Sequence, residues 1–284
     1  KVRSKVDPHY IYDTERGQFK GLSSDLTNGE LLLSNSLTSF TSSGFSLGSD
    51  AATNSNNHTY ASWTFRKSPK FFSVVTYTGD GNTEQAVAHD LEVAPACYVI
   101  KQTDSTGDWW FYTTVIDGSH DYSKLNTTNA FADSSRTLPT STHVYPGGVL
   151  NTSGATYVIY MWASDAGGFG DDGEQNVISC GSFTTDGSGN SPVVNLGYEP
   201  QWLLVKGASE SSSWYLIDTM RGFNNAPAGS VSALTLYPNL NNAEAGAAYW
   251  NPTATGFYLG IVGGASQTYI YIAIRRGPIK TPES

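Results

Sequence analysis

Charged residues make up only 14% of this 284-residue chain, and its formal net charge is −9. No basic run is longer than the pairs Arg66-Lys67 and Arg275-Arg276. Because phosphate binding needs clustered lysine and arginine, the composition argues against a nucleic-acid partner. No apolar stretch approaches the roughly 20 residues that cross a bilayer. We therefore expect neither nucleic-acid binding nor membrane insertion.

Cysteine and histidine are also scarce, and neither has the spacing of a metal site. Cys97 and Cys180 lie in apolar, strand-like runs, which predicts two buried free thiols rather than a disulfide framework. The chain contains no GxSxG nucleophile elbow and no phosphate-binding glycine loop. We predict a protein that is not an enzyme, with no catalytic residues, no metal and no cofactor.

Aromatic residues and glycine are plentiful, and so are the residues that make turns. Short apolar runs such as FFSVVTY, ACYVIK and TYIYIAI are bounded by turn residues, as strands are. In the last run both faces are apolar, which predicts that one faces a core and the other a neighbouring unit. The two faces are Tyr269, Tyr271 and Ala273 against Ile270, Ile272 and Ile274. One stretch, residues 26–36, could form a short helical turn.

Several phrases occur more than once. WYLIDTMRG (214–222) repeats YIYDTERG (10–17), and VAPACYVIK (93–101) aligns with YEPQWLLVK (198–206), each ending in lysine. A Tyr-led phrase occurs three times, starting at residues 60, 157 and 269. The offsets give a repeat of about 100 residues.

The sequence therefore predicts an all-β fold of tandem β-sandwich repeats of about 100 residues, two complete and one partial. We place the partial repeat at residues 1–69 and the complete repeats at 70–166 and 167–284. Because the partial repeat holds only the second half of the pattern, we expect its missing strands upstream or on another chain, and the whole to be a segment of a longer polypeptide.

The repeated Asp-Thr-x-Arg-Gly is the sharpest candidate site. Asp13 with Arg16, and Asp218 with Arg221, stand three residues apart before a glycine. Each pair predicts either an ion pair that fixes a turn or a contact between units, or else a site for an anionic or sugar ligand. The middle repeat (WWFYTTVID, 109–117) lacks the Asp, the Arg and the Gly, so folding of a repeat does not require them.

Aromatic side chains give a second set of candidates, because sugars stack on exposed aromatic faces. Trp109 and Trp110 are neighbours on one predicted strand and should point to opposite faces, so one is expected to be exposed. Tyr249 and Trp250 lie in a variable segment where no strand pattern requires burial. We predict these four as ligand contacts, with core packing or subunit contact as the alternative.

The acidic turn GDDGE contains Asp171, Asp172 and Glu174. Paired carboxylates hydrolyse glycosides, but a flexible linker favours a solvated turn. These three would become relevant only if the chain degraded polysaccharide.

The phrases YTGDG, AHDLEVAP, NSNNHTYASWTFRK, WYLIDTMRG and TYIYIAIRRGPIKTP together resemble repeats in large structural proteins of marine tailed bacteriophages. Nearly the whole chain is covered. The resemblance implies a tail-fibre-like virion component on the outside of the particle, and it supplies no catalytic residues.

On this basis we expect a tail-fibre or adhesin segment that contacts the host surface. Its expected partners are other virion proteins, copies of itself (a trimer is favoured) and a host surface glycan or receptor. Two alternatives stay open: a capsid-decorating or tail-associated protein without a receptor role, and a polysaccharide-degrading tailspike.

Overall fold

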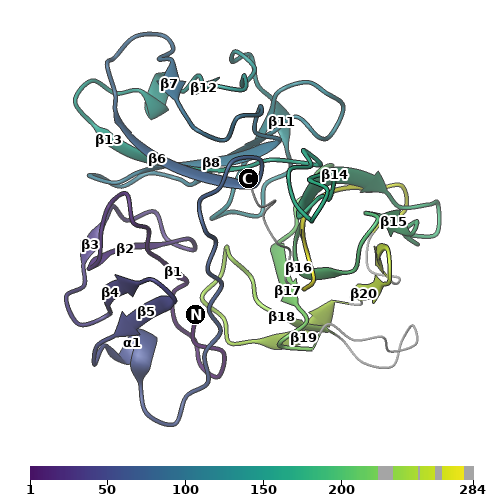
Figure 1. Ribbon diagram of the computed structural model, residues 1–284, viewed down its shortest axis with the longest axis horizontal. Helices are drawn as coiled ribbons and strands as arrows, with labels where there is room; N and C mark the ends of the chain where they lie inside the picture. Colours follow the sequence, from purple (N-terminus) through teal and green to yellow (C-terminus); the bar gives the residue numbers. More distant parts are fainter. Residues whose placement is uncertain (223–232, 249, 260–263, 278–284) are drawn as a thin grey trace.

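The computed structural model describes residues 1–222, 233–248, 250–259 and 264–277. Its described regular structure is almost all antiparallel strand, with one short helix, α1 (Ala51–Asn54), and one 3-10 turn, η1 (Gly148–Leu150). The predicted all-β fold is confirmed. Figure 1 shows three lobes around a common centre, which we name by the predicted ranges as the first, second and third units.

The first unit consists of short strands. β1, β2 and β3 form one sheet, and β4 and β5 form a hairpin that α1 follows. The predicted helical turn at 26–36 is wrong, because Leu31 and Leu32 pair with β2 while α1 begins at Ala51. The strands are β1 (Tyr10–Ile11), β2 (Lys20–Ser23), β3 (Leu31–Leu32), β4 (Leu37–Thr41) and β5 (Gly44–Leu47).

The second unit is built on a six-stranded sheet in the order β11-β10-β9-β8-β13-β6, with β7 and β12 paired beside it. The strands of the sheet are β6 (Phe72–Thr78), β8 (Cys97–Gln102), β9 (Trp110–Thr113), β10 (Asp121–Lys124), β11 (Ala132–Asp133) and β13 (Thr156–Trp162). The small pair is β7 (Val87–Ala88) and β12 (His143–Val144).

The third unit has a four-stranded sheet, β14-β22-β16-β17, and two smaller sheets, β15-β21-β20 and β18-β19. Its large sheet is β14 (Ile178–Thr184), β16 (Pro200–Gly207), β17 (Trp214–Asp218) and β22 (Thr268–Arg275). The others are β15 (Val194–Asn195), β18 (Ala233–Thr235), β19 (Ala245–Ala248), β20 (Trp250–Thr253) and β21 (Gly256–Leu259).

The large sheets of the second and third units share a strand order. β6-β13-β8-β9 in one corresponds to β14-β22-β16-β17 in the other, and all of these pairs are antiparallel. The register also agrees: Thr78 faces Thr156 in the second unit, and Thr184 faces Thr268 in the third. The repeated phrases therefore occupy equivalent strands.

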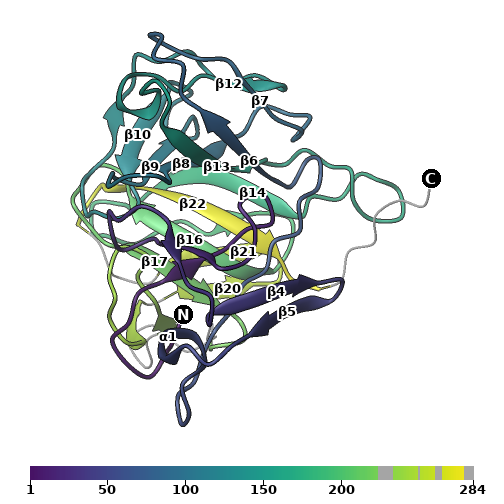
Figure 2. The same ribbon diagram turned by 90° about the vertical axis from the view of Figure 1, so that its left-hand side faces the viewer.

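β22 is buried on both faces, as its alternating apolar residues predicted. Tyr269, Tyr271 and Ala273 pack with Phe257 and Trp250 inside the third unit. The three isoleucines of the opposite face join a cluster that contains the sheet of the second unit. Figure 2 shows the sheet of the second unit lying above that of the third. The prediction that one face contacts a neighbouring unit is confirmed.

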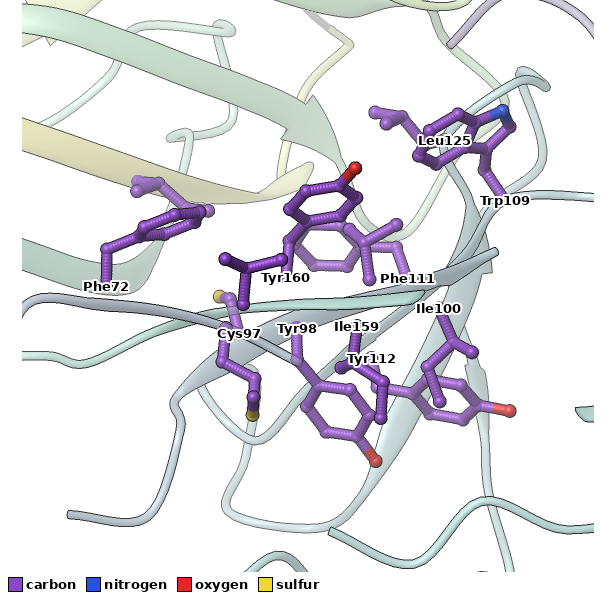
Figure 3. Packing of buried hydrophobic residues seen from close by; sticks show 14 of the residues in the cluster. Phe72, Cys97, Tyr98, Ile100, Trp109, Phe111, Tyr112, Leu125, Ile159 and Tyr160 are labelled. Carbon is purple, nitrogen blue, oxygen red and sulfur yellow. The ribbon is translucent and has the colours of Figure 1, made fainter. Parts of the chain in front are cut away.

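Figure 3 shows the core of the second unit from close by. Phe111 and Tyr160 lie on one side of its sheet, and Tyr98 and Tyr112 lie on the other. Cys97 and Cys180 are both buried and free, as predicted.

Candidate functional site

The Asp-Thr-x-Arg-Gly phrase of the first unit forms a buried ion pair against the second unit. Arg16 Nε donates to Asp13 Oδ2 at 2.6 Å, and Arg16 Nη1 donates to Glu30 Oε2 at 3.2 Å. The hydroxyl of Tyr160, from β13 of the second unit, donates to the same Asp13 oxygen at 2.7 Å. Burial opposes the charge on Arg16, but Tyr160, Asp13 and Glu30 outweigh it and raise the pKa of its guanidinium above the ordinary value.

The same arrangement occurs where the third unit meets the first. Arg221 Nε donates to Asp218 Oδ2 at 2.6 Å, and its Nη1 donates to Glu244 Oε1 at 2.8 Å. The indole N–H of Trp63, from the first unit, donates to Asp218 Oδ2 at 2.9 Å. Trp63 and Tyr160 both stand fourth in the Tyr-led phrase. The repeated motif is thus a contact between units, clamped by an aromatic donor from the neighbour.

The second unit lacks the glutamate of this set. Phe131 takes its place, because the backbone N–H of Phe131 donates to Ala208 O of the third unit as those of Glu30 and Glu244 donate to Thr103 O and Arg3 O. Its ring packs on Phe111 and Trp214 at ring-centroid distances of 5.9 and 6.1 Å. The fourth residue of the Tyr-led phrase in the third unit is Ile272, which is buried in the same cluster. The contact between the second and third units therefore lacks both the ion pair and the donor from the neighbouring unit.

The glycine of the motif is not lost from the second unit. Gly118 has φ +92° and donates to Thr114 O at 3.1 Å, as Gly17, with φ +94°, donates to Asp13 O at 3.0 Å. The expectation that this unit lacks the glycine is wrong, because one extra residue shifts it along the sequence. The turn needs the left-handed conformation that glycine tolerates, whether or not an ion pair is present.

A second contact is formed by a lysine in each unit. The lysine side chain enters the neighbouring unit and donates to a backbone carbonyl there. The bonds are Lys101 Nζ to Thr27 O at 3.1 Å, Lys206 Nζ to Thr128 O at 3.2 Å and Lys1 Nζ to Asn241 O at 2.8 Å. The same three carbonyls each accept a backbone N–H six residues beyond the lysine, from Gly107 at 2.8 Å, Ser212 at 2.9 Å and Asp7 at 2.8 Å.

A third contact lies eight residues beyond each lysine. The indole N–H of Trp109 donates to Ser23 O of the first unit at 2.8 Å, and that of Trp214 donates to Lys124 O of the second at 3.2 Å. The residue eight positions after Lys1 is His9, which is buried and lies close to Leu240 and Arg221 of the third unit. Equivalent residues thus join the second unit to the first, the third unit to the second, and the first unit to the third.

The three lysines predict a dependence of stability on pH. Burial lowers the pKa of Lys1, Lys101 and Lys206 from 10.5 to about 8. Between pH 8 and 10.5 the unfolded chain then binds more protons than the folded chain, so the free energy of unfolding rises with pH in this window. We expect a gain on the order of 1–3 kcal/mol per lysine.

Urea unfolding at several pH values from 8 to about 9.5, below the ordinary tyrosine pKa near 10, checks this. Relative to Lys101→Met, the wild type should gain stability as pH rises. If the free energy of unfolding changes with pH in the same way for the two proteins, Lys101 has an ordinary pKa.

A cleft lies beside the first of the ion pairs, between the first and second units. Its volume is about 560 Å³. The first unit contributes Glu15, Arg16, Lys20 and Glu30. The second unit contributes threonines and tyrosines of β6 and β13, with Thr103 and Asp104 just after β8. Of these residues, the sequence analysis predicted only Arg16 as part of a site. The pattern that could have indicated the cleft is threonine at alternate positions of an otherwise apolar strand, VVTYT.

The predicted aromatic contacts have different locations. Trp109 is fully buried in the contact between units and presents no face to a ligand. Trp110 is half-buried, on the opposite face of the strand, with Lys124 Nζ 4.9 Å from its ring centroid. Trp250 is buried in the core of the third unit, where β20 pairs with β21. Tyr249 lies outside the described residues.

Acidic residues elsewhere form local turns. Asp171, Asp172 and Glu174 are exposed, and Asp172 accepts the backbone N–H of Glu174 at 3.0 Å. Among the described residues, no group of three or more His, Cys, Asp and Glu side chains is placed to hold a metal ion. No described helix is long and apolar enough to cross a membrane.

The fold and these contacts define an all-β protein whose antiparallel sheets are joined by hydrogen bonds and ion pairs between units. The chain belongs to the family described as "Domain of unknown function (DUF7483)", whose sequence profile matches residues 1–278. The match spans all three units. Comparisons with curated proteins and with solved structures found no match.

Proposed function

We propose that this chain is a non-enzymatic structural protein of a bacteriophage particle, a tail-fibre or adhesin segment that contacts the host surface. The observation that carries the proposal is the set of equivalent contacts between units, in which lysines and tryptophans of one unit are buried in the next. A body locked in this way holds its polar loops in fixed positions, and binding surfaces are commonly built on such loops.

The contacts between units also suit a protein exposed to changing salt. Buried ion pairs are screened much less than exposed ones, and the side chains of Arg221 and Asp218 are each only 2% exposed. The resemblance of the repeated phrases to virion proteins supports the same location. Other virion proteins are the proposed partners.

A homo-oligomer, with a trimer favoured, is part of the proposal. Leu31, Leu32, Phe45 and Leu47 of the first unit are all exposed, on β3 and on the β4-β5 hairpin. Exposed apolar groups on short open strands favour contact with another copy. Light scattering of the purified chain would measure its mass in solution.

Antibody labelling of intact particles tests the proposed location. We expect label on the tail or its fibres, and blocking of attachment to host cells by the same antibody. Label confined to the capsid would support the decorating-protein alternative, and absence of the chain from purified particles would reject both. Shortening of host glycan by the purified protein would reject the non-enzymatic assignment.

A further inference from the structure

We propose that the cleft between the first and second units binds a neutral, polyhydroxylated ligand, a short stretch of carbohydrate. This inference rests on the proposed attachment function for the source of that ligand. A volume of about 560 Å³ lies within the roughly 300–1,000 Å³ of ordinary ligand sites.

One wall of the cleft is a row of threonines on adjacent strands. Thr78 pairs with Thr156, and the hydroxyl of Thr156 lies 2.7 Å from that of Thr103. Thr76, two residues before Thr78, faces the same way. Within the described part of the chain, neither the Thr76 nor the Thr78 hydroxyl has a hydrogen-bond partner, and both residues are exposed. These two hydroxyls are available to a ligand.

The opposite wall carries charges that are already paired with one another. Glu30 accepts from Arg16 at 3.2 Å and lies 3.3 Å from Lys20. On the threonine side, Asp104 follows β8 and accepts the backbone N–H of Thr156 at 2.9 Å. The pairing fixes carboxylate acceptors and cationic donors in place before any ligand arrives.

This mixture selects one ligand chemistry. An anionic ligand would meet the carboxylates of Glu15, Glu30 and Asp104, and a cationic one would meet Arg16 and Lys20. An apolar ligand would desolvate all five without replacing their hydrogen bonds. A sugar hydroxyl both donates and accepts, so it can use carboxylates, cations and threonine hydroxyls together.

The contact between the second and third units is the internal control. There Phe131 takes the place of Glu30 and packs on aromatic rings. Thr184 and Thr268 correspond to Thr78 and Thr156, and their hydroxyls lie 3.1 Å apart. The threonine pair is thus kept in both contacts, but the charged wall is present only in the first.

Calorimetric titration of the purified chain with neutral oligosaccharides of glucose, mannose and N-acetylglucosamine tests the proposal. We expect saturable binding of at least one, and amide NMR shifts that concentrate at Thr76, Thr78, Lys20 and Asp104. Thr78→Val and Asp104→Asn should each weaken binding about tenfold or more. Thr184→Val should leave it unchanged. Unaltered thermal unfolding of each variant shows that it is folded.

Absence of saturable binding by all the neutral oligosaccharides would overturn the proposal. Binding that the Thr78→Val and Asp104→Asn variants retain in full, or that only a polyuronate or a polyamine shows, would overturn it too. The antibody experiment separates the two ideas. Label on the tail without sugar binding rejects the cleft alone, and sugar binding by a chain absent from particles rejects the virion assignment alone.

Discussion

Arg221→Ala is expected to destabilise the protein by about 3–5 kcal/mol, because breaking a buried ion pair leaves a buried charge without its partner. The Arg221 side chain is 2% exposed, and its removal leaves the equally buried Asp218 carboxylate without a cation. Glu244 loses one of its two partners and keeps its ion pair with Arg3 at 2.7 Å. Trp63 also lies over the guanidinium, at 5.2 Å from its ring centroid. The measurement is the urea midpoint of the purified variant.

The chain itself supplies the control for this result. Arg276→Ala removes an ion pair to Glu199 whose side chains are 59% and 36% exposed, and an exposed pair is worth about 0–1 kcal/mol. A loss of equal size in both variants would contradict the account.

The second unit shows how the ion pair can be replaced as a whole. Asp218→Thr, Arg221→Ile and Glu244→Phe together replace the whole charged set with uncharged side chains, and the threonine and phenylalanine copy Thr114 and Phe131 of the second unit. Arg3, which loses Glu244, has a side chain that is 27% exposed and stays hydrated. We expect the triple variant to be more stable than Arg221→Ala alone, because replacing a whole buried charge network is often neutral while breaking it is costly. Additive losses from the three substitutions would reject this explanation.

Trp109→Ala should cost about 3–5 kcal/mol, the range for removing a fully buried tryptophan. Its ring stacks on Tyr160 at 6.4 Å between centroids, and its N–H bonds to the first unit. The neighbouring residue provides the comparison: Trp110→Ala, on the half-buried face, should cost about 1 kcal/mol. Thermal and urea unfolding measure the loss of stability in each variant. An equal loss of stability in the two variants would show that Trp109 does not join the units.

The strands and the ion pair of the Asp-Thr-x-Arg-Gly motif could be predicted from the sequence, because each rests on a local pattern. It did not show that Trp63 and Tyr160 complete the two ion pairs, since each lies over a hundred residues from its partner. The signal was present, however. The Tyr-led phrase has an N–H or O–H donor at its fourth position twice and Ile272 once, as the ion pair occurs twice and is absent once.

Lys1 was missed for a different reason. Lys101 and Lys206 end recognisable strands, and no such pattern marks Lys1. Lys1 is recognised as equivalent to the other two lysines only by the residue eight positions later. That residue is His9, whereas the other units have a tryptophan there, so the sequence pattern does not match. The helical turn predicted at 26–36 failed because its leucines pair with β2, a tertiary preference that overrides local propensity.

Disulfide trapping at the contact between the first and third units tests the central claim most directly. Three cysteine pairs replace the residues joined by backbone hydrogen bonds: Gly107 with Thr27, Ser212 with Thr128, and Asp7 with Asn241. If the three units close on one another, all three pairs oxidise to intramolecular disulfides at similar rates. If the units form an open string, the first two pairs react and the pair at positions 7 and 241 does not.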